Sequence, residues 1–191
     1  QLGTGHAVQQ AAPFLNDDST CLILYGDVPL IQSKTLEELL IKARTSGFSL
    51  LSVVLDDPSG YGRIIRDTNG LIQSIVEQKD ASERQQNVKE INTGIMAIKG
   101  SLLKKYLNEL KPNNAQGELY LTDIVESAVK DNVNIASFVC ENASEVMGIN
   151  DKKQLSQAER FYQVRQAEDF MSSGLTIMDP SRFDCRGGLT F

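Results

Sequence analysis

The sequence predicts an α/β protein built on a doubly wound, mostly parallel sheet, and three segments favour that class. Residues 20–25 form a short apolar run rich in β-forming residues, typical of a strand buried on both faces, after a helical segment at 6–15. Ser33 is a candidate cap for an amphipathic helix that Gly47 ends. A second apolar run, 48–55, follows. Strand, helix and strand at this spacing form the repeating unit of a doubly wound sheet.

The middle of the chain predicts shorter strands. Runs 63–65 and 71–76 flank the turn 67–70, in which Asn-Gly supplies positive φ angles at low cost, so a hairpin is expected. The charged stretch 80–90 is expected to be a loop. Residues 91–98 then return as a strand.

The last third is expected to be mostly helical. Residues 102–110 and 121–130 have the pattern of helices, and 135–139 that of a strand. From Asp151 to Met171 the pattern fits one long amphipathic helix with Asp151 as its cap.

The predicted elements divide the chain into three parts. Residues 1–150 are expected to form the main domain, 151–173 a long linker helix, and 174–191 the start of a connection to another domain. The first residue is not methionine, so we expect the natural chain to begin further upstream.

Composition narrows the classes of partner. The 191 residues carry a net charge of -6, with a pI near 4.9, which argues against a nucleic-acid backbone or an anionic membrane as the main partner. Three widely spaced cysteines without a CxxC pair suit a reducing compartment. No apolar run has the roughly 20 residues that a membrane span needs. We therefore expect a cytoplasmic protein.

Asp27 is the first candidate for chemistry. It follows a predicted buried strand, and open parallel sheets bind ligands beyond the carboxyl ends of their strands. Gly26 allows close approach of a ligand, and Pro29 turns the chain away from the sheet. The pattern fits a metal-binding carboxylate, and it equally fits an ordinary Asx-turn after a strand.

Gly3, Thr4 and Gly5 stand at the expected start of a helix, where backbone amides favour a polar or anionic ligand. A plain turn explains the same residues. His6 is the only histidine and has no nearby partner for a zinc site.

Three further places carry groups suited to a sugar. Residues 60–63, Gly-Tyr-Gly-Arg, bracket an aromatic ring with glycines, while Glu77 ends one expected strand and Asn92 begins another. A carboxylate and an amide together can hold sugar hydroxyls and an acetamido group by hydrogen bonds. Each residue alone also fits an ordinary surface role.

Seven motifs in order give these fragments a common explanation. They are GTGHA at 3–7, LYGDVPL at 24–30, GYGRI at 60–64, IVEQKDA at 75–81, EINTGI at 90–95, NNAQGELYLTDI at 113–124 and GIN at 148–150. With them, the chain closely resembles the bacterial bifunctional N-acetylglucosamine-1-phosphate uridyltransferase and glucosamine-1-phosphate acetyltransferase family over essentially its whole length. The resemblance implies a Rossmann-like nucleotide-diphospho-sugar transferase fold that lacks its first βα unit here.

The resemblance also implies roles for the nucleotide-binding residues. Gly3 and Thr4 match contacts to uracil, and Tyr25, Gly26 and Asp27 match the segment that meets the ribose and the metal.

Two further groups follow from the same resemblance. Asp27 and Asn150 match the two protein ligands of Mg²⁺ and are the residues through which catalysis would act. The contacts to N-acetylglucosamine match Gly62, Glu77, Asn92, Tyr120 and Thr122.

The implied reaction transfers a uridylyl group from UTP to N-acetylglucosamine 1-phosphate, giving UDP-N-acetylglucosamine and pyrophosphate for the cell envelope. The family's triphosphate-holding loop would lie upstream of residue 1, so we expect this fragment to be inactive alone. Acetyl transfer and a homotrimer would belong to the parent protein. Two alternatives remain: a nucleotidyltransferase for another base or sugar, and a non-catalytic module.

Overall fold

The structure is a computed structural model that describes residues 2–191. The chain forms two compact units: one takes in the residues up to Tyr25 together with Ile31–Ala143, and the other comprises Gly26–Leu30 and Ser144–Phe191. None of the helices in the described range combines the length and apolar character that crossing a membrane requires.

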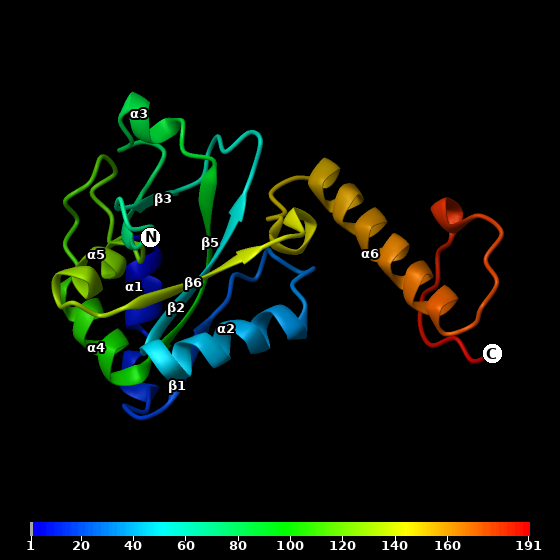
Figure 1. Ribbon diagram of the computed structural model, residues 1–191, viewed down its shortest axis with the longest axis horizontal. Coiled ribbons are helices and arrows are strands. Elements are labelled where there is room, and N and C mark those ends of the chain that lie inside the picture. The colour runs from blue at the N-terminus through cyan, green and yellow to red at the C-terminus, as the bar shows by residue number, and fades with distance from the viewer. Residues whose placement is uncertain (1) are drawn as a thin grey trace. The chain divides into compact units, whose positions relative to one another are not determined.

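The first unit is built on one six-stranded sheet (Figure 1). Its strands are β1 (Thr20–Ile23), β2 (Phe48–Val54), β3 (Arg63–Arg66), β4 (Ile72–Val76), β5 (Glu90–Lys99) and β6 (Ile135–Cys140). The order across the sheet is β4-β3-β5-β2-β6, and β1 also pairs with β5.

The pairing corrects one expectation. Within the described residues only β2 and β6 pair in parallel, whereas β5 runs antiparallel to β1, β2 and β3, and β3 to β4. β1, β2 and β6 do share one direction, as a doubly wound sheet requires. However, β5 is inserted between β1 and β2 in the opposite direction, so most neighbours are antiparallel. The α/β, Rossmann-like class is confirmed, but the sheet is mixed.

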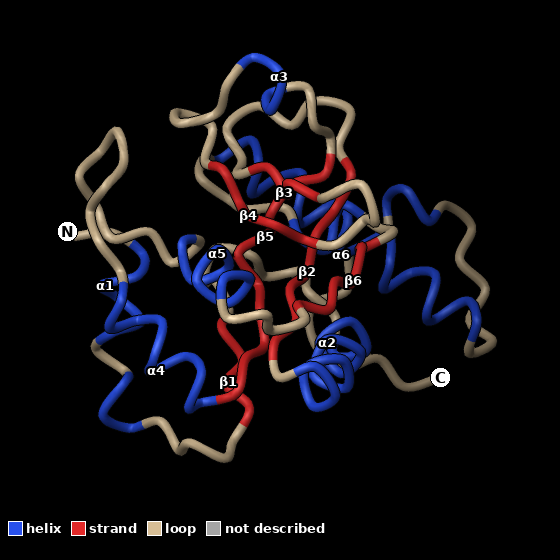
Figure 2. The backbone as a smooth tube through the Cα atoms, turned by 60° about the vertical axis from the view of Figure 1, so that its left-hand side comes forward, coloured by secondary structure: helices blue, strands red, loops and turns tan. Residues whose placement is uncertain are grey.

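Helices cover both faces of this sheet. They are α1 (Thr4–Gln9), α2 (Ser33–Ser46), α3 (Glu83–Gln86), α4 (Gly100–Glu109) and α5 (Asp123–Lys130), with the 3₁₀ turn η1 (Ala12–Phe14). Alternate residues of β2 face opposite sides. Phe48 and Leu50 belong to the core that α4 and α5 cover, while the Ser49 hydroxyl donates to the Leu39 carbonyl of α2. Figure 2 shows α2 and α4 on opposite sides of the strands.

Most expected elements are present with small changes at their ends. Gly47 ends α2 with φ +83°, and Gly70 adopts φ +82° in the hairpin turn. The expected helix at 6–15 is split into α1 and η1, because Pro13 lacks the amide hydrogen that a continuous helix would use. The expected loop at 80–90 contains α3, which Ser82 opens with a capping box.

The second unit is dominated by α6 (Lys152–Ser172). The predicted cap is confirmed: Asp151 Oδ1 accepts from the Gln154 amide at 2.7 Å, and Gln154 Oε1 accepts from the Asp151 amide at 3.2 Å. At the other end of α6 the Phe170 ring packs edge-on against Phe183 and Phe191. Two 3₁₀ turns complete the description, η2 (Ala143–Val146) and η3 (Pro180–Arg182).

Candidate functional site

β1 and β3 pair with the same edge of β5, and a stretch of that edge between them has no strand beside it. Since β2 pairs along the other edge, β1 and β3 both lie on this one: β1 pairs with Met96–Lys99 and β3 with Ile91. Next to these pairings the Asn92 backbone N–H donates to the Gly62 carbonyl, and the described strands provide no partner for residues 93–95 of β5 on that edge. Tyr25 follows β1 and Gly62 precedes β3, so predicted nucleotide and sugar residues stand at the ends of the strands that flank this opening.

Gly94 lies in this open stretch beneath the ring of Tyr25. A Cβ atom on Gly94 would stand 2.2 Å from Tyr25 Cε2, and the backbone adopts φ +79°. Only glycine fits both conditions. The sequence motifs do not single out Gly94 as a site residue, although a glycine inside a strand is a known sign of close approach.

Four of the five predicted sugar contacts lie together. The Thr122 hydroxyl donates to Glu77 Oε1 at 3.0 Å, and the backbone N–H of Asn92 donates to the Gly62 carbonyl at 2.8 Å. A Cβ on Gly62 would stand 3.2 Å from Glu77 Oε2. Gly62 therefore leaves the room that the Glu77 carboxylate occupies.

Glu77 and Tyr120 share an electrostatic environment. Burial raises the pKa of Glu77; the Thr122 hydrogen bond opposes this shift, and the nearby charge of Asp80 adds to it. Burial also raises the pKa of Tyr120, with further contributions from Asp80 and Glu77. The fifth predicted sugar contact is thus within electrostatic reach of the same carboxylate.

The predicted metal ligands meet in the second unit. A Cβ placed on Gly148 would be 3.8 Å from both the Asp27 carboxylate and the Asn150 amide, so the two side chains flank this glycine. The Ile149 amide donates to the Asp27 carbonyl at 2.9 Å, which holds the two segments together. Both side chains are exposed. A carboxylate and an amide oxygen suit Mg²⁺, which usually keeps several waters and takes other ligands from substrate phosphates.

Across residues 2–191, no group of three or more histidine, cysteine, aspartate or glutamate side chains is arranged to hold a metal ion.

The predicted nucleotide residues fall in both units. Gly3 adopts φ +100°, and a Cβ there would stand 2.5 Å from the Leu119 carbonyl. Thr4 Oγ1 accepts from the Leu121 amide at 3.0 Å. Both residues therefore anchor the chain beside the segment of Tyr120 and Thr122. Gly26 and Asp27 belong to the second unit.

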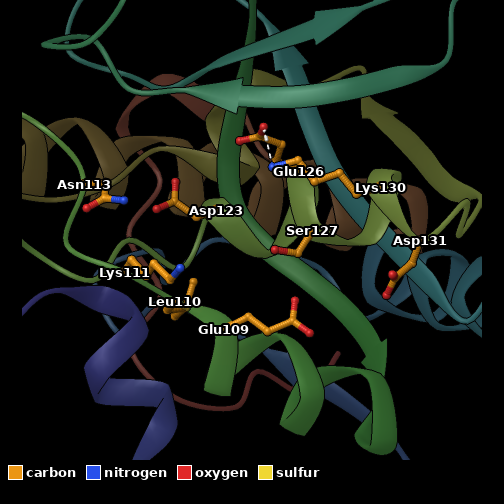
Figure 3. Close-up of a pocket in the computed structure, with 9 residues that line it drawn as sticks. All are labelled: Glu109, Leu110, Lys111, Asn113, Asp123, Glu126, Ser127, Lys130 and Asp131. Atoms are coloured by element: carbon orange, nitrogen blue, oxygen red, sulfur yellow. Dashed lines mark ion pairs between the residues drawn. The ribbon is translucent and has the colours of Figure 1, made fainter.

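A groove of about 660 Å³ lies elsewhere in the first unit, at a place that no sequence motif marks. Its lining comes from the end of α4, the following loop and α5 (Figure 3): Glu109, Leu110, Lys111, Asn113, Asp123, Glu126, Ser127, Lys130 and Asp131. Glu126 and Lys130 form an ion pair at 2.8 Å. Burial raises the pKa of Asp123 to about 6, with further contributions from Glu126 and Glu77.

Asp123 should make stability depend on pH. Its pKa of about 6 in the folded state exceeds the ordinary 3.8, so the folded protein holds this proton more tightly than the unfolded chain. Stability is therefore lost as the pH rises from about 4 to about 6. Replacing Asp123 with Asn should raise the unfolding free energy at pH 7.5 by about 1–2 kcal/mol, allowing for partial solvent screening, and by only a few tenths of a kcal/mol at pH 4, close to the unfolded pKa.

Chemical denaturation at the two pH values measures this effect. Asp18→Asn makes the same chemical change at a fully exposed side chain and should alter stability at neither pH. An Asp123→Asn effect of equal size at pH 4 and pH 7.5 would contradict the pH dependence.

The mixed sheet with helices on both faces defines an α/β protein of the class that binds ligands at the ends of its strands. The chain belongs to the nucleotidyl transferase family, whose model matches residues 1–147.

Curated relatives are similar along the whole chain. The bifunctional protein GlmU of Ruthia magnifica is 57% identical over all 191 residues, that of Vesicomyosocius okutanii 58%, and that of Hydrogenovibrio crunogenus 53%. The chain spans 42% of the length of each of these relatives.

Proposed function

We propose that this chain carries the site at which a uridylyl group passes from UTP to N-acetylglucosamine 1-phosphate, with Mg²⁺ bound by Asp27 and Asn150. The observation that carries the proposal is the contact network that joins Gly62, Glu77 and Thr122. It presents a half-buried carboxylate that the Thr122 hydroxyl orients and that packs closely against Gly62, where a side chain would displace it.

The chain's own residues would bind and align the substrates. Glu77 and Asn92 accept and donate hydrogen bonds to sugar hydroxyls and the acetamido group, and Thr122 fixes the Glu77 carboxylate. The Tyr25 ring, which packs closely against Gly94, would offer a surface for the ribose. Bound Mg²⁺ would neutralise charge on the phosphates.

No protein nucleophile is needed in this reaction. An oxygen of the sugar phosphate attacks the α-phosphorus of UTP, that bond forms as the bond to pyrophosphate breaks, and pyrophosphate leaves. Alignment of the two reactants can contribute about 7–11 kcal/mol to lowering the barrier.

The proposal extends to a whole protein like the GlmU relatives. There, residues 1–150 would be the uridyltransferase domain, 151–173 the linker helix and 174–191 the approach to an acetyltransferase domain that uses acetyl-CoA and builds a homotrimer. We propose a cytoplasmic location, with the product serving peptidoglycan and lipopolysaccharide synthesis.

A substrate panel tests the proposed function. Pyrophosphate release by the whole protein is measured with UTP, dTTP or ATP, each combined with N-acetylglucosamine 1-phosphate or glucose 1-phosphate. Release only with UTP and N-acetylglucosamine 1-phosphate is expected. Preference for another pair would favour a different sugar nucleotidyltransferase. Metal-dependent binding without release would favour the non-catalytic alternative.

Replacing Glu77 with Gln should chiefly weaken binding of the sugar phosphate. The change keeps the size of the side chain but removes a charged acceptor, which is worth about 10- to 100-fold in KM for N-acetylglucosamine 1-phosphate. KM for UTP should stay within about twofold of wild type. Steady-state kinetics measures both, and Glu83→Gln, at an exposed position on α3, is the matched control. Unchanged kinetics for the sugar phosphate would argue against this pocket.

A further inference from the structure

The β3–β4 hairpin carries two of the proposed sugar contacts, and it pairs with the rest of the sheet over a short ladder. Gly62 directly precedes β3 and Glu77 directly follows β4, so both stand at the open end of the hairpin. The ladder between β3 and β5 consists of the single pair Arg63 and Ile91. This pair, the neighbouring hydrogen bond from the Asn92 backbone N–H to the Gly62 carbonyl and the Thr122–Glu77 contact all hold the open end of the hairpin, so a contact further along β3 is needed to set its angle to β5.

Apolar packing holds the hairpin against the core. Ile72 and Ile75 of β4 are buried in the core that α5 helps to cover. The hydrophobic effect is non-directional, so this burial specifies the angle of the hairpin less sharply than a hydrogen-bonded ion pair does.

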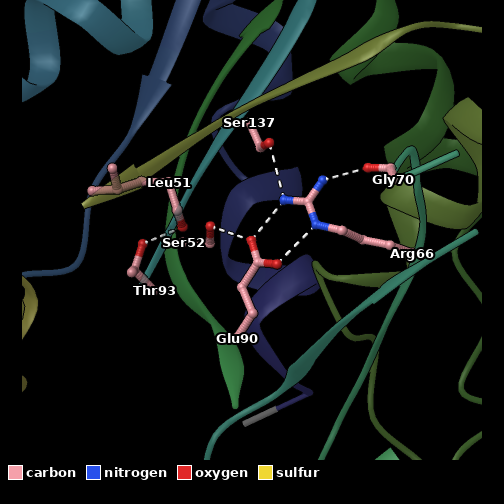
Figure 4. A network of polar contacts seen from close by, with 7 residues as sticks. All are labelled: Leu51, Ser52, Arg66, Gly70, Glu90, Thr93 and Ser137. Atoms are coloured by element: carbon pink, nitrogen blue, oxygen red, sulfur yellow. Dashed lines mark hydrogen bonds and ion pairs between the residues drawn. The ribbon is translucent and has the colours of Figure 1, made fainter. Parts of the chain in front are cut away.

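A directional contact stands at the far end of β3. The guanidinium of Arg66 forms a fork on Glu90, with Nε 2.8 Å from Oε2 and Nη2 2.6 Å from Oε1. Nη2 also donates to Ser137 Oγ at 3.0 Å and Nη1 to the Gly70 carbonyl at 2.8 Å, while the Ser52 hydroxyl donates to Glu90 Oε1 at 2.6 Å (Figure 4). The group ties β3 and its turn to β5, β2 and β6.

This contact is largely shielded from solvent. The side chains of Arg66 and Glu90 are 26% and 16% exposed. Burial alone would raise the pKa of Glu90, but hydrogen bonds from Arg66 and Ser52 outweigh it and lower the pKa. The pair therefore stays ionised at neutral pH, and a two-point fork between planar groups fixes their relative orientation.

We propose that Arg66 and Glu90 are positioning residues for sugar-phosphate binding, acting through the hairpin; this inference rests on the proposed function. Glu90 lies two residues before Asn92 on β5, and Arg66 lies on the strand that follows Gly62. The fork thus sets the hairpin's angle relative to β5 and, with it, the place of the Glu77 carboxylate beside Thr122 and Asn92.

The experiment measures KM for each substrate and kcat in the whole protein. Arg66→Lys keeps the charge but loses the fork, and Glu90→Gln keeps the shape but loses the charge. Each should raise KM for N-acetylglucosamine 1-phosphate by about tenfold, because a small misplacement of a binding group is costly, while KM for UTP stays within about twofold. Arg44→Lys, the same change at an exposed position on α2, should alter neither of the two KM values.

Two further variants separate positioning from stability. Ser137→Ala removes one hydrogen bond and should give a smaller rise in the same KM, with the fold retained. In the double variant Arg66→Lys with Glu90→Gln, KM should be no higher than in the worse single variant, because both changes break one contact.

The outcomes distinguish failure of the proposed function from failure of the positioning role of Arg66 and Glu90. A wild-type protein that is inactive with UTP and N-acetylglucosamine 1-phosphate overturns the proposed function, and with it the role of the fork. An active wild type whose Arg66→Lys and Glu90→Gln variants lose thermal stability, but keep the ratio of the two KM values, overturns the positioning role alone.

Discussion

Replacing Asp27 with Asn is expected to abolish measurable turnover, a loss of about 1000-fold, while the fold stays intact. Asn keeps the size of the side chain but removes the negative charge that would hold Mg²⁺ beside Asn150. The loss expected is that typical of removing one group that stabilises charge in a transition state.

The structure gives a reason to expect an intact fold. The Asp27 side chain is exposed, and the contact that secures this segment, from the Ile149 amide to the Asp27 carbonyl, uses only backbone atoms. Thermal stability of the Asp27→Asn variant should therefore match that of wild type.

Pyrophosphate release over a range of MgCl₂ concentrations measures the effect. Asp56→Asn is the matched control, because Asp56 is also an aspartate shortly after a strand, and its side chain is fully exposed in a weak ion pair with Lys89. Near-normal turnover of Asp27→Asn with Mg²⁺ would refute its assignment as a ligand.

Local signals in the sequence were sufficient to predict most elements. Capping and turn chemistry act within a few residues, which explains why the starts and ends marked by Asp151, Gly47 and Gly70 were predicted correctly. An apolar run likewise predicts a strand, but it carries no information about direction. The antiparallel insertion of β5 between β1 and β2 depends on long-range pairing and was missed for that reason.

The candidate site shows the same division. The resemblance supplied Glu77, Thr122, Asp27 and Asn150, and the structure shows which of these are neighbours. The resemblance does not identify Gly94 as a site residue, because its importance depends on the Tyr25 ring 69 residues earlier in the chain. Nor does it predict the groove beside Asp123, which forms only when α4 and α5 pack.

Replacing Gly94 with Ala should cost about 2–4 kcal/mol of unfolding free energy. About 1–2 kcal/mol comes from placing a Cβ atom at φ +79°, and the remainder from the clash with the Tyr25 ring, 2.2 Å away. The ring, or β5 itself, must move for the variant to fold. Either movement disturbs the proposed ribose surface, so KM for UTP should also rise.

Gly70 separates these two causes. It has nearly the same backbone angle, φ +82°, but a Cβ there meets nothing within 4 Å, so Gly70→Ala should show the backbone cost alone. Tyr25→Ala removes the ring, so Gly94→Ala should cost less stability in the Tyr25→Ala protein than in wild type, and the difference is the part due to the clash. Chemical denaturation of wild type, the two single variants and the double variant measures it. If Gly94→Ala costs no more than Gly70→Ala, or if the two Tyr25 and Gly94 changes simply add, then Tyr25 does not determine the need for glycine at position 94.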